Sequence, residues 1–172
     1  MFDEYKITMA MEIASRSIIP SARWYHDPCL RDKYKNTVAL YLAWHDIIPP
    51  KEWIHPTEWK GSMGRTIALF LSLHGITPPD YWQHDPTLRD DYSRETVAMF
   101  LADKFIIPPD NWHHDPALID TSTHETVAMI LADHGIIPPD NWNHDPKLQS
   151  GVYHENRTVA MFLAENSIVP PV

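Results

Sequence analysis

The sequence predicts an all-α fold, a right-handed or curved solenoid of about six stacked short helical repeats of about 30 residues each. Three observations predict this fold. A segment close to Thr-Val-Ala-Met recurs at nearly constant spacing along the whole chain, which is typical of repeat architectures. Each copy carries the start and stop signals of one short helix, followed by turn residues. No stretch alternates apolar and polar residues, so a sheet is not expected.

The repeat divides the 172-residue chain into units, and we expect residues 1–172 to form a single repeat domain. An average unit is T-V-A-M-x-L-A-x-x-G-I-I-P-P-D-x-W-x-H-D-P-x-L-x-D, followed by a short variable tail. No unit can bury its own apolar residues, so neighbouring units must stack. The units begin near Thr8, Thr37, Thr66, Thr96, Thr126 and Thr158.

The elements of one unit follow from its local signals. Thr126 is the predicted N-cap of a helix of about nine residues, which ends at Gly135. Pro138-Pro139 cannot continue a helix, so it turns the chain. Residues 139–142 suit a single helical turn that starts with proline. Asp145-Pro146 repeats a cap-and-proline start and predicts another short helical segment.

A tryptophan and a histidine recur at fixed places in the units. We interpret the tryptophans as core residues and expect Trp112 to be buried between its neighbours. Equivalent positions of stacked helices lie about 8–10 Å apart, whereas zinc ligands lie within about 2 Å of the ion, so the histidine column cannot chelate a metal by itself. We predict no metal ligand and no cofactor. The columns are Trp24, Trp53, Trp82, Trp112 and Trp142, with His26, His55, His84, His114 and His144.

The sequence shows no catalytic constellation. The repeated aspartates occupy identical positions, whereas a catalytic carboxylate pair needs two different environments. There is no glycine-rich phosphate loop and no Gly-x-Ser-x-Gly motif. We therefore predict that the protein is not an enzyme. These aspartates are Asp27, Asp85, Asp115 and Asp145.

The segment Thr-Val-Ala-Met-x-Leu-Ala-x-x-Gly resembles the first helix of an ankyrin repeat, T-P-L-H-x-A-x-x-x-G. The resemblance covers about ten residues of each copy. Valine stands in place of the family's proline, and methionine or leucine stands in place of its histidine. The Pro-Pro turn and the Trp-x-His-Asp-Pro element replace the second helix. The resemblance implies a divergent ankyrin-like scaffold that binds proteins and carries no catalytic residues.

Recognition in a repeat scaffold is expected where the copies differ while the frame stays constant. The tails that precede each cap threonine differ most, and they contain tyrosine and arginine, which concentrate binding energy at interfaces. Two further tryptophans lie outside the regular column. The predicted partner-binding residues are Tyr34, Trp44, Trp59, Tyr92, Arg94, His124 and Tyr153.

The charge of the chain bears on its partner. The net charge is −9, and residues 61–172 carry six Lys and Arg against fifteen Asp and Glu. An acidic surface repels phosphate, so we predict no nucleic-acid partner and consider a basic protein the best electrostatic match. The N-terminus has no secretory signal and no apolar run spans a membrane, so a cytoplasmic location, which could be inside a host cell, is expected.

The predicted function is therefore a non-enzymatic scaffold, adaptor or inhibitor that binds another protein through the variable inter-repeat loops. One alternative is an acidic nucleic-acid mimic that blocks a nuclease or a DNA- or RNA-binding protein, as an antagonist encoded by a phage or pathogen would. A second alternative is a repeat protein that binds a metal or small ligand. Salt dependence separates the first two, because mimicry weakens steeply with added salt.

Overall fold

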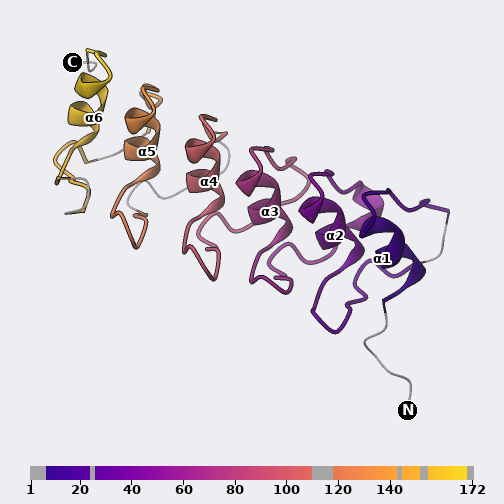
Figure 1. The fold of residues 1–172 in the computed structure, drawn as a ribbon. Coiled ribbons are helices and arrows are strands. Elements are labelled where there is room, and N and C mark those ends of the chain that lie inside the picture. Colours follow the sequence, from indigo (N-terminus) through magenta and orange to yellow (C-terminus); the bar gives the residue numbers. More distant parts are fainter. Residues whose placement is uncertain (1–6, 24–25, 110–117, 143–144, 152–154, 170–172) are drawn as a thin grey trace.

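The computed structural model describes residues 7–23, 26–109, 118–142, 145–151 and 155–169. Figure 1 shows the helices side by side in one elongated row, with the two chain ends at opposite ends of the row. Each α-helix packs against the next one in the sequence. The helices of the described residues are α1 (Met9–Ala14), α2 (Val38–Trp44), η1 (Lys51–Trp53), α3 (Ile67–Leu73), α4 (Val97–Asp103), α5 (Val127–Asp133) and α6 (Val159–Glu165).

The prediction of an all-α solenoid is confirmed. Within the described ranges, the only strand-like pairings are two isolated bridges, Arg89 with Thr96 and Ile119 with Thr126. None of the helices in those ranges combines the length and hydropathy needed to cross a membrane.

Threonine caps start the α-helices, as the sequence predicts. The hydroxyl of Thr37 accepts from the N–H of Leu40 at 3.2 Å, and that of Thr126 accepts from the N–H of Met129 at 3.3 Å. Such a cap stabilises a helix by about 1 kcal/mol. The helices are shorter than the predicted nine residues, since α5 has 7 residues and the chain leaves the helix at His134.

A residue with left-handed backbone conformation follows the end of each α-helix. Gly135 has φ 73°, and the N–H of Ile136 then bonds back to the carbonyl of Leu131 at 2.9 Å, so the predicted stop at Gly135 is confirmed. Four other copies adopt the same conformation with a side chain present, which costs backbone strain that glycine avoids. These residues are Ser17, Asp46, Phe105 and Ser167, with φ of 62° or 63°.

The core consists of columns of equivalent apolar residues, one from each helix. The residue three positions after the cap threonine is at most 1% exposed in five helices: Met11, Leu40, Leu69, Met99 and Met129. Met161 holds the same position in α6 and is 51% exposed. Burial of this column therefore depends on the next helix in the row, as expected for a stacked array.

The described segments after the Pro-Pro pairs are single turns, and the one after Pro50 is the short 3-10 helix η1. The N–H of Trp82 bonds to the carbonyl of Pro79 at 2.9 Å, which confirms the predicted single helical turn. The prediction of a helical segment starting at Asp145-Pro146 is wrong. Asp145 accepts from the N–H of Lys147 at 2.9 Å, and Leu148 bonds to the carbonyl of Asp145, so the segment is one capped turn. After this turn the N–H groups of Ser150 and Gly151 bond to the carbonyls of Arg157 and Thr123, so the turn does not extend into a helix.

The tryptophan and histidine columns interleave between repeats. The rings of His26 and Trp53 lie 5.5 Å apart, and those of His55 and Trp82 also lie 5.5 Å apart. Trp53 and Trp82 are each 2% exposed, which confirms the core interpretation for them. Burial lowers the pKa of His55, because desolvation disfavours the charged ring. Trp24, Trp112, His114, His144 and Asp115 lie outside the described residues.

Candidate protein-binding edge

The tails that precede the cap threonines form closed loops, called tail loops below. The first begins at Asp32, whose N–H bonds to the carbonyl of Asn36 at 3.0 Å. The same bond closes each later loop, so all have a fixed base beside the start of a helix. The tail loops are residues 32–36, 61–65, 90–95, 120–125 and 150–157.

A buried aspartate holds the base of three tail loops. Asp32, Asp90 and Asp120 are 0%, 0% and 4% exposed, respectively. Oδ1 of Asp90 accepts from the N–H groups of Tyr92 at 2.8 Å and Ser93 at 2.7 Å. Burial alone would raise the pKa of Asp90, but its hydrogen bonds, first that from Arg65, lower the pKa below its ordinary value. These three loops are therefore fixed from inside by buried carboxylates.

Three of the tail loops, 32–36, 90–95 and 120–125, carry exposed side chains at their tips. Tyr34 is 53% exposed and Tyr92 is 90% exposed. Arg94 and His124 are also exposed, and both lie two residues before a cap threonine with left-handed backbone, φ 67° and 58°. The frame thus constrains the backbone at these positions and leaves the side chains projecting. These four predicted residues lie on one series of loops.

The structure does not place the other three predicted binding residues on the exposed tips of the tail loops. Trp44 ends α2, at the opposite end of that helix from the tail loop, and stacks on Phe70 at 6.1 Å. Trp59 is half-buried, with the guanidinium of Arg31 4.7 Å from its ring centre. This contact joins the first repeat to the second, and the binding role of Trp59 stays a prediction. Tyr153 lies outside the described residues.

A ladder of basic side chains joins successive tail loops, which sequence reasoning missed. Arg31 donates to the carbonyl of Lys60 at 2.8 Å, Lys60 to the carbonyl of Arg89 at 2.8 Å, and Arg89 to the carbonyl of Ile119 at 2.9 Å. The donors occupy equivalent positions in consecutive units. In the sequence, the available signal was that Arg or Lys recurs directly before the first residue of these tail loops.

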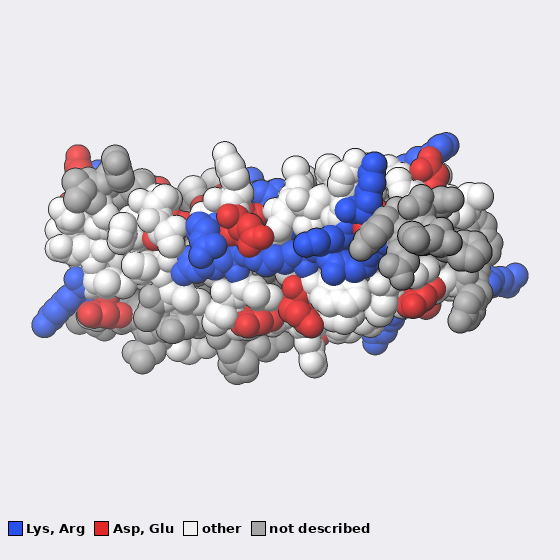
Figure 2. Space-filling view, turned by 90° about the horizontal axis from the view of Figure 1, so that it is seen from below, with Lys and Arg blue, Asp and Glu red and all other residues white. Residues whose placement is uncertain are grey.

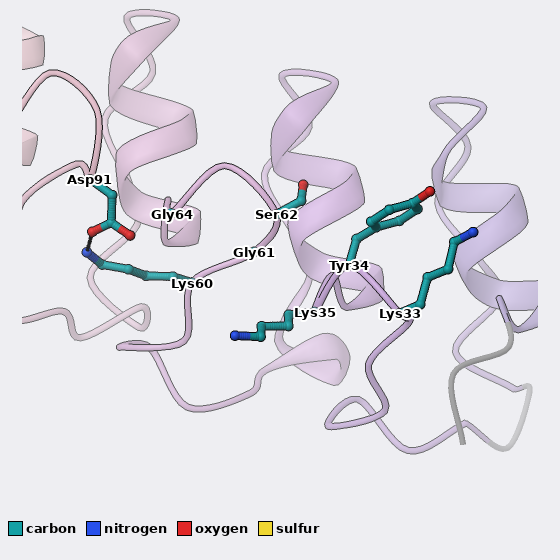
Figure 3. A pocket seen from close by; sticks show the side chains of 8 residues that line it. All are labelled: Lys33, Tyr34, Lys35, Lys60, Gly61, Ser62, Gly64 and Asp91. Atoms are coloured by element: carbon teal, nitrogen blue, oxygen red, sulfur yellow. Dashed lines mark hydrogen bonds and ion pairs between the residues drawn. The ribbon is translucent and has the colours of Figure 1, made fainter. Parts of the chain in front are cut away.

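Basic side chains gather on one face. Figure 2 shows Lys and Arg forming a nearly continuous band across the middle of the face seen from below, with acidic side chains beside it. Tail loops 32–36 and 61–65, with Asp91 of the following loop, line a cleft of about 510 Å³ that also includes Lys60. Figure 3 shows Lys60 reaching to Asp91, with which it forms an ion pair. This cleft, called the basic cleft below, gives the edge positive charge despite the net negative charge.

Tail loops 90–95 and 120–125 line a cleft of opposite charge, called the acidic cleft below. It has a volume of about 490 Å³, and its lining includes Glu95, Asp103, Asp120 and Glu125. Burial raises the pKa of Glu95 to about 7, and Asp103 adds to the effect, whereas a hydrogen bond with Ser93 opposes it. The edge therefore changes sign along its length.

The histidines and carboxylates do not assemble a metal centre in the described part of the chain. No group of three or more His, Cys, Asp or Glu side chains there is arranged to hold an ion. The histidine column instead contacts tryptophan, and the Asp-Pro aspartates cap turns, as Asp27 does by accepting from the N–H of Cys29 at 2.8 Å.

No protein-family model matches the sequence, and no curated protein matches it. Solved structures do match in fold. The ankyrin repeat domain of Bcl-3, described as a member of the IkappaB family, has a TM-score of 0.56 at 12% identity, covering 80% of this chain and 67% of that one. The ankyrin repeat protein EF0377 also has a TM-score of 0.56 at 12% identity, covering 95% and 94%.

A third similar chain comes from the complex of the predatory endopeptidase Bd0816 of Bdellovibrio bacteriovorus with the immunity protein Bd3460. Its TM-score is 0.56 at 14% identity, and the match covers 94% of each chain. The fold of the present chain is thus that of an ankyrin-like repeat protein. The likeness inferred from the Thr-Val-Ala-Met segment is confirmed at the level of the fold. Such stacked repeats are typically binding scaffolds with an extended recognition surface.

Proposed function

We propose that the protein is a non-enzymatic scaffold that binds another protein through its tail loops, as an adaptor or an inhibitor. The observation that carries the proposal is the contrast within the tail loops 32–36 and 90–95. A buried base is held by hydrogen bonds, while the tips present exposed and variable side chains such as Tyr34, Tyr92 and Arg94. A rigid base reduces the entropy lost on binding, and tyrosine and arginine are common anchors of interfaces.

The similar structures support this proposal. One of them comes from a complex of an endopeptidase with an immunity protein, which shows that a chain of similar fold occurs in a protein–protein assembly. An inhibitory role for the present chain is consistent with that example. The proposal treats residues 1–172 as one array in which neighbouring tail loops contact the same partner.

The experiment is capture from cells of the protein's own source, with matched variants. The wild type and two double variants are immobilised in parallel. Tyr34→Ser with Tyr92→Ser alters the tail loops. Phe105→Ser with Ile107→Ser alters exposed apolar residues after α4, 63% and 45% exposed, and serves as the control.

The proposal predicts one protein captured by the wild type and by the control variant, lost from the tail-loop variant, and bound again when both purified proteins are mixed. Capture that survives the tail-loop change and fails with the control variant would place recognition elsewhere. Capture of nucleic acid in place of a protein would also contradict the proposal.

The acidic-mimic alternative is supported by the acidic cleft and by the net charge of −9. It requires an affinity dominated by long-range charge, so binding of the captured partner would fall steeply between low and physiological salt. A scaffold that binds through anchored aromatic side chains shows a shallow salt dependence. The slope of log Kd against log salt therefore separates the two functions.

A further inference from the structure

Two successive repeats place different side chains beside their buried aspartates. Arg65 directly precedes a cap threonine, and its Nε donates to Oδ2 of Asp90 in the next tail loop. One repeat later, the same two positions are Glu95 and Asp120. Two carboxylates thus stand where an arginine and an aspartate pair one repeat earlier.

One oxygen of Asp120 lacks the donor that its equivalents have. Oδ1 accepts from the N–H groups of Ser122 and Thr123, both at 2.7 Å. Oδ2 is buried and has no hydrogen-bond partner within the described residues. By contrast, Oδ2 of Asp32 accepts from the hydroxyl of Tyr41 at 2.6 Å, and Oδ2 of Asp90 accepts from Arg65. Asp120 is only 4% exposed and lines the acidic cleft.

The surroundings of that oxygen favour a cation. Asp103 and Asp120 both act electrostatically on Glu95, and among the described residues that line the cleft there is no Lys, Arg or His. Tyr92 also lines the cleft, and an aromatic ring is a group on which a planar cation can stack. The hydrogen bonds of its loop lower the pKa of Asp120 although burial opposes them, so this carboxylate is ionised.

We propose that the acidic cleft binds one arginine side chain of the partner protein, whose guanidinium donates to Oδ2 of Asp120 and to the carboxylate of Glu95. The inference rests on the proposed protein-binding function and names the chemistry that the partner presents at one site. The partner's guanidinium would contact Asp120 as Arg65 of this chain contacts Asp90 one repeat earlier. It enters a cleft of about 490 Å³, which is large enough for a side chain.

Arginine fits this cleft better than the other cations. A metal ion needs three or more ligands converging on one point, and the described carboxylates do not converge in that way. Lysine presents a single point charge, whereas the planar fork of arginine reaches two carboxylates at once and stacks on an aromatic ring. The cleft offers both features in Glu95 with Asp120 and in Tyr92.

The test titrates the whole protein with N-acetyl-arginine amide, and with the citrulline analogue as an uncharged control of the same shape. The readout is the amide chemical shift of Ser122 and Thr123, because both N–H groups bond to Asp120. The amide of Tyr34, bonded to the equivalent Asp32, is the internal control. Titration extends to about 50 mM at low salt, because a single amino-acid side chain binds weakly and salt screens its charge.

Two variants sharpen the test. Glu95→Gln removes one carboxylate and is expected to weaken arginine binding by about threefold or more. Glu95→Arg supplies the guanidinium from within the chain, so it abolishes the arginine response and raises the melting temperature. The proposal expects saturable shifts at Ser122 and Thr123 with arginine only, and none at Tyr34.

Equal shifts with citrulline, shifts that persist in Glu95→Arg, or no shift at these amides would each overturn the proposal. No partner protein takes part in this titration. A failure here removes the arginine site and leaves the capture experiment to decide the protein-binding function separately.

Discussion

Replacement of Trp82 by alanine tests the interleaved tryptophan and histidine columns. The side chain is 2% exposed and packs against the ring of His55. A tryptophan buries roughly 150–250 Å², which at about 25 cal/mol per Å² corresponds to roughly 4–6 kcal/mol of transfer free energy. Alanine keeps part of this burial and the surroundings relax, so Trp82→Ala is expected to lower the free energy of unfolding by about 3–5 kcal/mol.

The lost hydrogen bond adds little to that figure. Nε1 of Trp82 donates to the carbonyl of Pro49 at 3.3 Å, but the hydroxyl of Tyr81 donates to the same carbonyl at 3.0 Å and still satisfies it. The assay is urea unfolding followed by circular dichroism at the helix band. Trp44→Ala is the control, because Trp44 is 42% exposed and its removal should cost about 1 kcal/mol. A loss for Trp82→Ala no larger than that of the control would refute the reasoning.

Three further predictions follow from the frame and the clefts. Lys35→Gly should raise the free energy of unfolding by about 0.5–1 kcal/mol, because Lys35 has φ 67°, whereas Lys33→Gly should lower it; chemical denaturation measures both. Arg65→Ala should cost about 3 kcal/mol in the same assay, because it leaves the fully buried Asp90 without its cation, and a loss under 1 kcal/mol would contradict the ion pair. The pKa of Glu95 rises from 4.5 to about 7 on folding, so the folded chain binds more protons in that range. Stability should therefore fall as pH rises through 7, by about 1 kcal/mol after allowance for solvent exposure, and unfolding of Glu95→Gln measured across the same range should lack this slope.

The frame of this protein could be predicted from local signals, because caps and stops act within a few residues. Thr126 and Gly135 bound a helix for reasons visible in their immediate neighbours. The likeness to ankyrin repeats likewise rested on one helix. The second helix is a single turn around Trp82, as the Pro-Pro pair indicated.

The contacts between repeats could not be predicted in the same way, because they depend on the register of stacking. The sequence shows that Arg31, Lys60 and Arg89 recur, but which carbonyl each one reaches follows only from the placement of the next unit. The acidic cleft depends on the same register, since Glu95 and Asp120 are 25 positions apart in the sequence.

The predicted site shows the same division. Tyr34 and Tyr92 could be placed on projecting loops because they stand in variable tails, and the structure exposes both. Trp59 was predicted as a binding residue because it is an aromatic outside the regular column, and the structure leaves it half-buried under Arg31 of the preceding repeat. Exposure of an irregular aromatic depends on neighbours that the sequence does not identify.

The central claim is that the tail loops recognise the partner. Its most direct test is the affinity of the captured partner for the double variant Tyr92→Ala with Arg94→Ala. Both side chains lie at the tip of one tail loop and are exposed, so their removal should leave the free energy of unfolding within about 0.5 kcal/mol. Titration calorimetry with purified partner should show at least about tenfold weaker binding, equivalent to about 1.4 kcal/mol. An unchanged Kd for this variant, measured beside a fully folded wild type, would contradict recognition by the tail loops.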